Sequence, residues 1–108
     1  MNPSERQRLD TECDAARAEL QSYFHPDEVP AELAELNGWA LMLGVGDEVC
    51  RAHFVARLSP DEAHAAAALV DAHALALQHW LDSFGDQPLS DEATALMYLA
   101  LAVEELRG

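Results

Sequence analysis

The segment from Ser59 to Gly85 is the feature that most limits how this chain can fold. Ser59, Pro60 and Glu62 form a helix start, with a serine cap, a proline at the first helical position and a glutamate that completes a capping box. The residues that follow, HAAAALVDAHALAL, are rich in alanine and carry apolar side chains at helical spacing. We therefore predict one helix from Pro60 to about Phe84, ended by Gly85 and roughly 37 Å long.

Two further segments predict helices. Ser4 and Gln7 form a capping box, and apolar residues at helical spacing follow, so we expect a helix from about Glu5 to Phe24. Near the other end, Ser90 can cap a helix from residue 91 to residue 106. Its centre, ALMYLALAV, is apolar on all sides, which is typical either of the middle of a bundle or of a dimer interface. The alanines of the long helix would let this last helix approach closely.

The middle of the chain allows two interpretations. Apolar residues from Val29 to Leu43 follow a helical stripe, but Asn37 and Gly38 can also end a helix before a strand. Residues 50–58 alternate between apolar and polar as a half-buried strand does, whereas Asp47 can cap a helix there. We predict a single all-α domain over residues 1–108, a small bundle of four to five helices. The alternative is an α+β fold with a β-hairpin at residues 39–58.

The charge of the chain excludes several kinds of partner. Twenty acidic residues stand against six arginines, lysine is absent, and the formal net charge is -14. Such a surface repels nucleic-acid phosphates and anionic membranes, so we expect no direct binding of nucleic acid and no membrane association. A basic protein is the natural complement. The simpler alternative is that the charge only keeps the protein soluble.

The N-terminal residues and the cysteines bear on location. The first ten residues, MNPSERQRLD, are polar, and no apolar run reaches the ~20 residues that span a bilayer. Cys13 and Cys50 are far apart in a small chain, so we expect them to be reduced core residues and not a bridge. Both observations indicate a cytoplasmic protein.

Carboxylates gather in one stretch without basic residues. Between Arg17 and Arg51 lie seven acidic residues and no base, so this stretch cannot neutralise itself locally. Its negative field could steer association with a positive surface. The residues expected to contact a partner are Asp27, Glu28, Glu32 and Glu35, joined by Asp47 and Glu48.

Catalytic and metal-binding patterns are weak. No two of the five histidines are four residues apart, so the usual helical pair of metal ligands is missing. Cys50 and His53, three residues apart, are the best candidate pair, and a metal there would need ligands from elsewhere. We found no acid-base constellation around a nucleophile and expect neither an enzyme nor a cofactor.

Three functional hypotheses follow from these observations. The first is an acidic, non-enzymatic protein-binding module, such as an immunity or inhibitor protein that covers a basic site on a nuclease, DNA-binding protein or nucleic-acid-guided complex. The second is a homodimeric helical scaffold that associates through its alanine-rich and C-terminal helices. The third is a protein that binds a metal or a small ligand through Cys50 and His53.

Overall fold

The chain folds into helices joined by short connections. A computed structural model describes residues 2–107, and in that range it contains no β-strand. The predicted all-α fold is confirmed, but with six α-helices instead of four or five, together with the 3-10 helices η1 and η2. The alternative β-hairpin at residues 39–58 is wrong, because most of those residues lie in α2 and α3. The elements are α1 (Pro3–Tyr23), η1 (Pro26–Glu28), η2 (Ala31–Leu36), α2 (Asn37–Leu43), α3 (Glu48–Ala56), α4 (Pro60–Ala72), α5 (Ala74–Asp82) and α6 (Asp91–Leu106).

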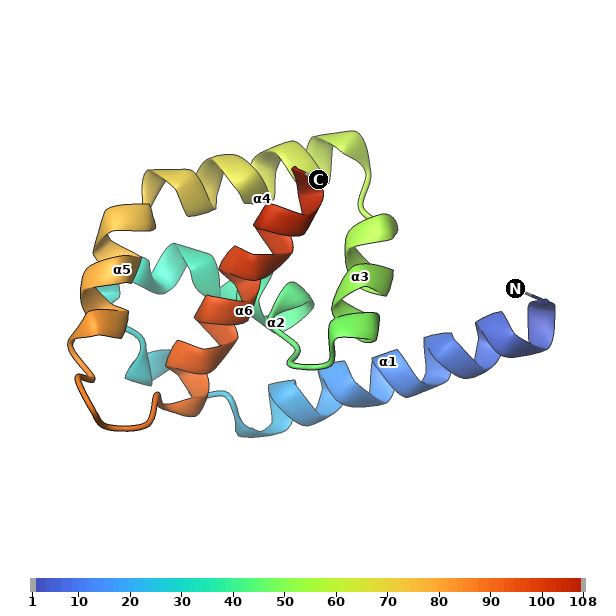
Figure 1. Ribbon diagram of the computed structural model, residues 1–108, viewed down its shortest axis with the longest axis horizontal. Helices are drawn as coiled ribbons and strands as arrows, with labels where there is room; N and C mark the ends of the chain where they lie inside the picture. Colours follow the sequence, from blue (N-terminus) through green and yellow to red (C-terminus); the bar gives the residue numbers. More distant parts are fainter. Residues whose placement is uncertain (1, 108) are drawn as a thin grey trace.

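Helix α6 is the centre of the bundle. It packs against α2, α3, α4 and α5, and Figure 1 shows it crossing the molecule between α5 and α3. Most of the residues that it buries are apolar, which explains why its centre is apolar on all sides. Among the described residues 2–107, no helix is both long enough and apolar enough to cross a membrane. The buried residues of α6 are Glu92, Ala93, Ala95, Leu96, Leu99, Ala102 and Val103.

The predicted starts of α4 and α6 are confirmed by their caps. The Ser59 side chain accepts from the backbone N–H of Glu62, and the Glu62 carboxylate accepts from the Ser59 N–H. That second bond lowers the pKa of Glu62. Ser90 caps α6 by accepting from the Ala93 N–H. The start of α1 differs from expectation, because Asn2 and not Ser4 provides the cap.

The stretch from residue 29 to residue 45 buries its apolar stripe as a 3-10 helix that continues into α2. Leu33, Leu36 and Leu43 are fully buried against the core. Gly44 then ends α2 where the chain meets α6. A Cβ at this position would overlap the carbonyl oxygen of Ala40 and lie 2.6 Å from that of Ala95. Only glycine allows this close approach of the two helices.

The predicted single helix from Pro60 to Phe84 is wrong, because the chain turns at His73. Figure 1 shows α4 and α5 running in different directions on either side of this point. The His73 ring nitrogen Nδ1 lies 2.9 Å from the Leu69 carbonyl oxygen, the acceptor that the His73 N–H would use in a continuous helix. The His73 N–H donates to Val70 instead. The turn lets α5 pack against both α6 and η2.

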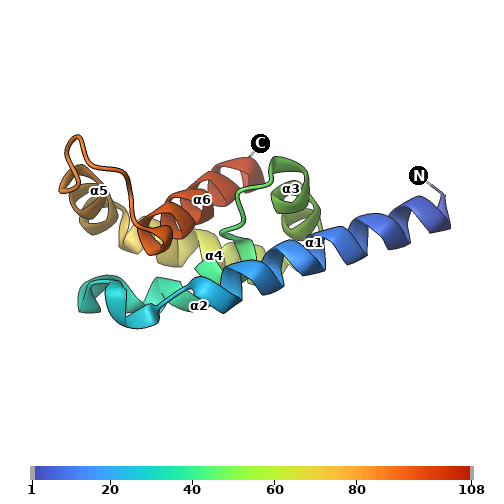
Figure 2. The same cartoon turned by 90° about the horizontal axis from the view of Figure 1, so that it is seen from below.

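Helix α1 is bonded covalently to α3. Cys13 and Cys50 form a disulfide with their Cα atoms 5.1 Å apart, so the prediction of reduced cysteines is wrong. The two residues are 37 positions apart in the chain, and only the packing of α1 on α3 brings them together. Disulfides persist in oxidising surroundings, so the cysteines no longer support a cytoplasmic location. Beyond α3 the N-terminal part of α1 extends past the rest of the bundle (Figures 1 and 2).

Candidate functional site

Four of the predicted contact residues lie on the 3-10 helices. Asp27 and Glu28 belong to η1, Glu32 and Glu35 belong to η2, and all four are exposed. We refer to these four residues as the acidic edge. Within residues 2–107 none of their carboxylates forms an ion pair or accepts a hydrogen bond. The structure therefore displays the charge that the sequence gathers in this stretch.

The backbone beneath the acidic edge is fixed. Val29, Leu33 and Leu36 alternate with the carboxylates and are buried in the core. Just before η1, the His25 backbone N–H donates to the Glu92 carboxylate at 3.0 Å. Glu92 is itself buried at the first turn of α6, where the helix dipole favours a negative charge. These contacts hold the four carboxylates on a rigid surface.

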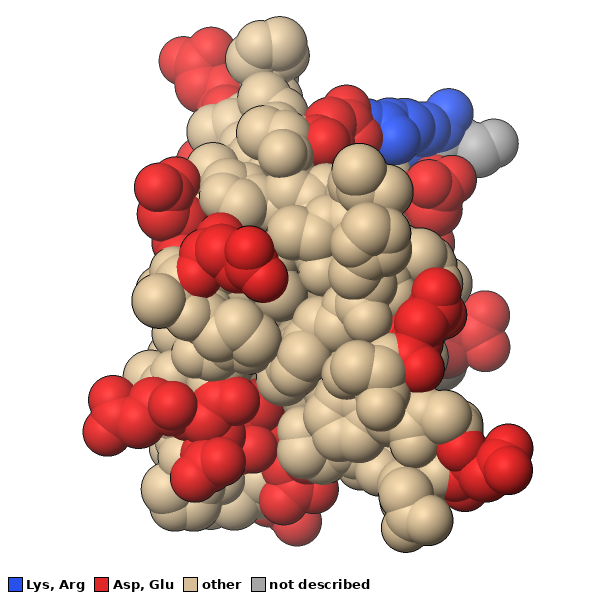
Figure 3. Space-filling model, turned by 90° about the vertical axis from the view of Figure 1, so that its left-hand side faces the viewer, with Lys and Arg blue, Asp and Glu red and all other residues tan. Residues whose placement is uncertain are grey.

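Negative charge continues from the acidic edge to the end of α1. The pKa of the Tyr23 hydroxyl is raised, first by burial and then by the carboxylates of Asp91, Glu19 and Glu92. Figure 3 views the molecule from the side of α5. Asp and Glu side chains are spread over this face, and Lys or Arg is visible only near one upper corner. A basic partner approaching here would meet a field of one sign.

The arginines do not neutralise the acidic edge, because within residues 2–107 none of them forms an ion pair with its carboxylates. Arg17 donates from Nε and Nη2 to the Met42 carbonyl oxygen at 3.2 and 3.0 Å, with its guanidinium over the Phe54 ring. Burial lowers the pKa of Arg17. Arg51 is buried and donates to the Val45 carbonyl oxygen. The ion pairs of the arginines within residues 2–107 are Arg51 with Glu105, Arg57 with Asp10, and Arg107 with Asp71 and Glu104.

The other two predicted contact residues do not join the acidic edge. Asp47 and Glu48 lie at the start of α3, on the opposite side of α6 from η1 and α5 (Figure 1). The Asp47 carboxylate accepts from the Cys50 N–H at 3.0 Å and so caps α3. Its role is local and structural, as at other helix starts.

A second charged site lies where α1 meets α3. Asp10 precedes Cys13 by three residues on α1, and His53 follows Cys50 by three residues on α3. The disulfide and the contact between Asp10 and His53 are therefore neighbouring contacts where α3 crosses α1. The Asp10 carboxylate oxygen Oδ1 lies 2.7 Å from His53 Nε2 and 3.1 Å from Arg57 Nη1. The His53 ring of α3 and the guanidinium group of Arg57, the residue that follows α3, thus approach the same carboxylate oxygen on α1.

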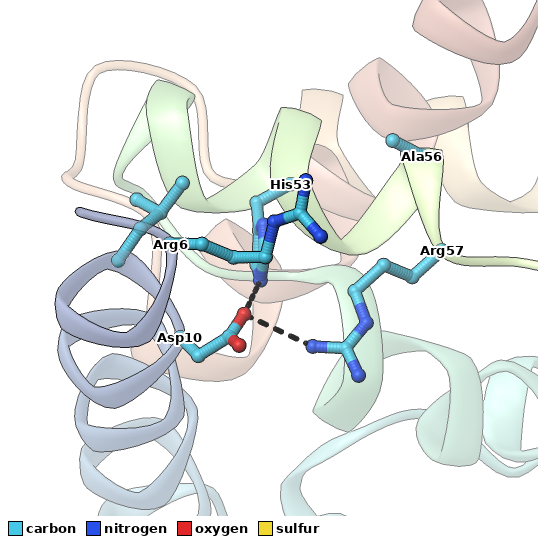
Figure 4. A pocket seen from close by; sticks show the side chains of 6 residues that line it. Arg6, Asp10, His53, Ala56 and Arg57 are labelled. Carbon is cyan, nitrogen blue, oxygen red and sulfur yellow. Dashed lines mark hydrogen bonds and ion pairs between the residues drawn. The ribbon is translucent and has the colours of Figure 1, made fainter. Parts of the chain in front are cut away.

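These groups line an open pocket of about 490 Å³, formed by Arg6, Leu9, Asp10, His53, Ala56 and Arg57. Figure 4 shows the Arg6 side chain reaching across from α1 toward His53, while Arg57 approaches Asp10 from α3. The nitrogen His53 Nε2 is buried and lies close to the Asp10 carboxylate, but the two groups are not aligned for a hydrogen bond. Their contact is therefore a close charge contact without a hydrogen bond. Within residues 2–107 Arg6 forms no ion pair. We refer to this pocket as the arginine pocket.

The structure removes the thiolate on which the hypothesis of a metal site at Cys50 and His53 depends. The Cys50 sulfur is bonded to Cys13 and cannot bind a metal while the disulfide is intact. His53 faces Asp10 and Arg57, and a cation such as Arg57 is an unfavourable neighbour for a metal ion. No group of three or more possible metal ligands exists in the described part of the chain, residues 2–107.

Sequence reasoning missed the arginine pocket although a signal was present. The two cysteines, if paired, place the residue three before the first opposite the residue three after the second, and these are Asp10 and His53. Asp10 and His53 can be placed opposite each other in this way only if the two cysteines are paired. Comparison with known proteins adds no assignment, because no protein-family model, curated protein or solved structure matches this chain.

Proposed function

We propose that the protein is a non-enzymatic binding module that covers a basic site on another protein with its acidic edge. The proposal includes the immunity or inhibitor class, whose targets would be a nuclease, a DNA-binding protein or a nucleic-acid-guided complex. One observation carries it: four exposed carboxylates without ion-pair partners in residues 2–107 stand on a backbone anchored by buried residues.

The energetics favour this use of the acidic edge. Unpaired like charges repel one another, so their arrangement does not stabilise the fold. A basic partner would turn that repulsion into attraction, raise the association rate and reject negatively charged competitors. Because the edge is anchored through Leu33, Leu36 and the hydrogen bond from His25 to Glu92, little ordering would accompany binding.

The packing of α6 weighs against the homodimeric scaffold. That hypothesis began from the apolar sequence of the C-terminal helix and the alanines near it. Within one chain, α6 already packs against four helices, and the alanine-rich α4 is one of them. Leu101 on α6 and Leu75 on α5 are exposed, but exposed leucines are ordinary on the surface of a monomer.

The test is retention of a partner by a charge-reversed variant. The protein is immobilised, exposed to lysate of its native host and eluted with a salt gradient, and the retained proteins are identified by mass spectrometry. A basic protein released as salt rises is expected from the wild type. The variant carries Asp27→Lys, Glu28→Lys, Glu32→Lys and Glu35→Lys, and it should lose that protein.

A matched control separates the acidic edge from the overall charge. Reversal of four other exposed carboxylates changes the net charge by the same amount and should leave retention intact. Equal loss from both variants would show that only the total charge matters, and retention by the edge variant would overturn the proposal. The control carries Glu5→Lys, Glu12→Lys, Asp14→Lys and Asp61→Lys.

A further inference from the structure

We propose that the arginine pocket binds a small organic oxyanion, such as a carboxylate carried on an apolar body. This site is separate from the acidic edge, and the proposal does not depend on the partner proposed above. It rests on the charge of the pocket, on the arginine donors that remain free within it and on its size.

The charge of the arginine pocket is opposite to that of the molecule. Arg6 and Arg57 supply two permanent positive charges, and Asp10 supplies one negative charge. The local balance is therefore positive in a protein of net charge -14. The negative surface around the pocket would repel a large polyanion, whereas a small anion can enter the pocket and meet the arginines directly.

Asp10 acts as a positioning residue in this arrangement. Its Oδ1 lies close to His53 Nε2 and accepts a hydrogen bond from Arg57 Nη1, which leaves the Nε and Nη2 donors of Arg57 for a ligand. Arg6 forms no ion pair within residues 2–107, so its guanidinium group can donate two parallel hydrogen bonds to an oxyanion. Asp10 lies on the same face of α1 as Arg6, and Figure 4 shows both side chains directed toward α3.

The shape of the pocket indicates the rest of the ligand. A volume of about 490 Å³ is within the range of roughly 300–1,000 Å³ that is typical of small-molecule sites. Leu9 and Ala56 provide apolar contacts beside the charged groups, so an inorganic anion would leave part of the pocket unused. The neighbouring disulfide between Cys13 and Cys50 fixes the spacing of α1 and α3, which keeps the pocket formed before a ligand arrives.

Benzoate is a suitable probe, and benzamide is its neutral counterpart of the same shape. Titration of isotope-labelled protein at low salt, followed by amide NMR, should show benzoate shifting residues around Arg6, His53 and Arg57. Acetate should bind more weakly because it lacks the ring, and benzamide should not bind there. Binding of benzamide as tight as that of benzoate would overturn the assignment of an anion site.

Two variants test which groups bind the probe. Arg6→Gln removes one charge-assisted contact and should weaken benzoate binding roughly three- to tenfold. Arg8→Gln is the matched control, because Arg8 lies on α1 outside the pocket lining and its loss changes the net charge equally. Its effect should remain within about twofold. Equal weakening by both variants would overturn the proposal.

Asp10→Asn tests the positioning role with an effect of opposite sign. Removing the competing carboxylate should tighten benzoate binding by roughly threefold, although it weakens the contact between α1 and α3. If the role of Asp10 were only structural, Asp10→Asn would lower the free energy of unfolding and would leave the affinity for benzoate unchanged or weaker. A different outcome would be that benzoate does not bind, while the wild type self-associates and Arg6→Gln does not. The pocket would then receive an acidic surface of a second copy, and the small-ligand proposal would be overturned.

Discussion

The two charged regions of this molecule differ in how their charges are used. In the arginine pocket the charges of α1 and α3 meet one another, with Asp10 contacting both His53 and Arg57 beside a disulfide. At the acidic edge no opposite charge lies within reach among the described residues. The backbone is held by buried residues in both places. We infer that order in this protein comes from packing and bonding, and we expect that the fold does not require the charge of the acidic edge.

Removal of the disulfide, which lies beside the arginine pocket, should have the largest effect on stability. The double variant Cys13→Ser and Cys50→Ser opens a loop of 37 residues, and chain entropy predicts a loss of about 3–4 kcal/mol in the free energy of unfolding. Urea unfolding of the variant, and of the wild type with a reducing agent, measures it. A loss below about 1 kcal/mol in both would show that the bond does not stabilise the junction.

The junction of α2 with α6, which lies between the two regions, should be the next most sensitive. Gly44→Ala forces a Cβ against the carbonyl oxygens of Ala40 and Ala95 and should lower the free energy of unfolding by about 1–3 kcal/mol. Gly38→Ala is the control in the same helix, because nothing lies within 4 Å of the added Cβ. It should stabilise the protein by about 0.5–1 kcal/mol. Thermal unfolding of the pair should give changes of opposite sign.

The hydrogen bond from His25 to Glu92, which anchors the acidic edge, should contribute less to the free energy of unfolding than the close contact at Gly44. Glu92→Ala leaves the His25 N–H without its acceptor and should lower the free energy of unfolding by about 1–2 kcal/mol. Glu92→Gln keeps an acceptor oxygen and should lower it less. Amide hydrogen exchange at residues 25–36 should speed up in Glu92→Ala. Unchanged exchange there would mean that the core residues alone fix the edge.

The smallest effect on stability is expected from reversing the acidic edge itself. Because its four carboxylates are exposed and form no ion pairs in residues 2–107, the fourfold Lys variant should unfold within about 0.5 kcal/mol of the wild type, or be slightly more stable. Chemical denaturation measures this. A large loss of stability would show that the charge of the acidic edge supports the fold, which would remove the difference between the two regions.

Local signals in the sequence predicted much of the fold. The caps Ser59 and Ser90 and the apolar stripes fixed the starts of α4 and α6 because these features act over a few residues. The choice between helix and hairpin at residues 39–58 stayed open, since the same apolar pattern fits both until the packing of α2 and α3 on α6 is known. The bend at His73 was not predicted, because histidine is not a helix breaker. It depends on the contact of the His73 ring with the Leu69 carbonyl oxygen and on the packing of α5 against α6 and η2, which no local sequence pattern shows.

The sites were predictable to different degrees for the same reason. The acidic edge is contiguous in sequence, and its exposure follows from the alternation with Val29, Leu33 and Leu36. The arginine pocket joins residues more than forty positions apart, such as Asp10 and Arg57, which no local pattern connects. Only the pairing of Cys13 with Cys50 links them, and that pairing is a property of the folded helices.

One measurement tests the division of the surface into two sites most directly. Isotope-labelled protein is titrated separately with benzoate and with a short lysine-rich peptide, and the amide shifts are mapped along the chain. Benzoate should shift residues around Arg6, His53 and Arg57, and the peptide should shift residues 27–36, with little overlap between the two sets. Shifts of the same amides by both probes, or peptide shifts spread evenly over all exposed carboxylates, would contradict the account.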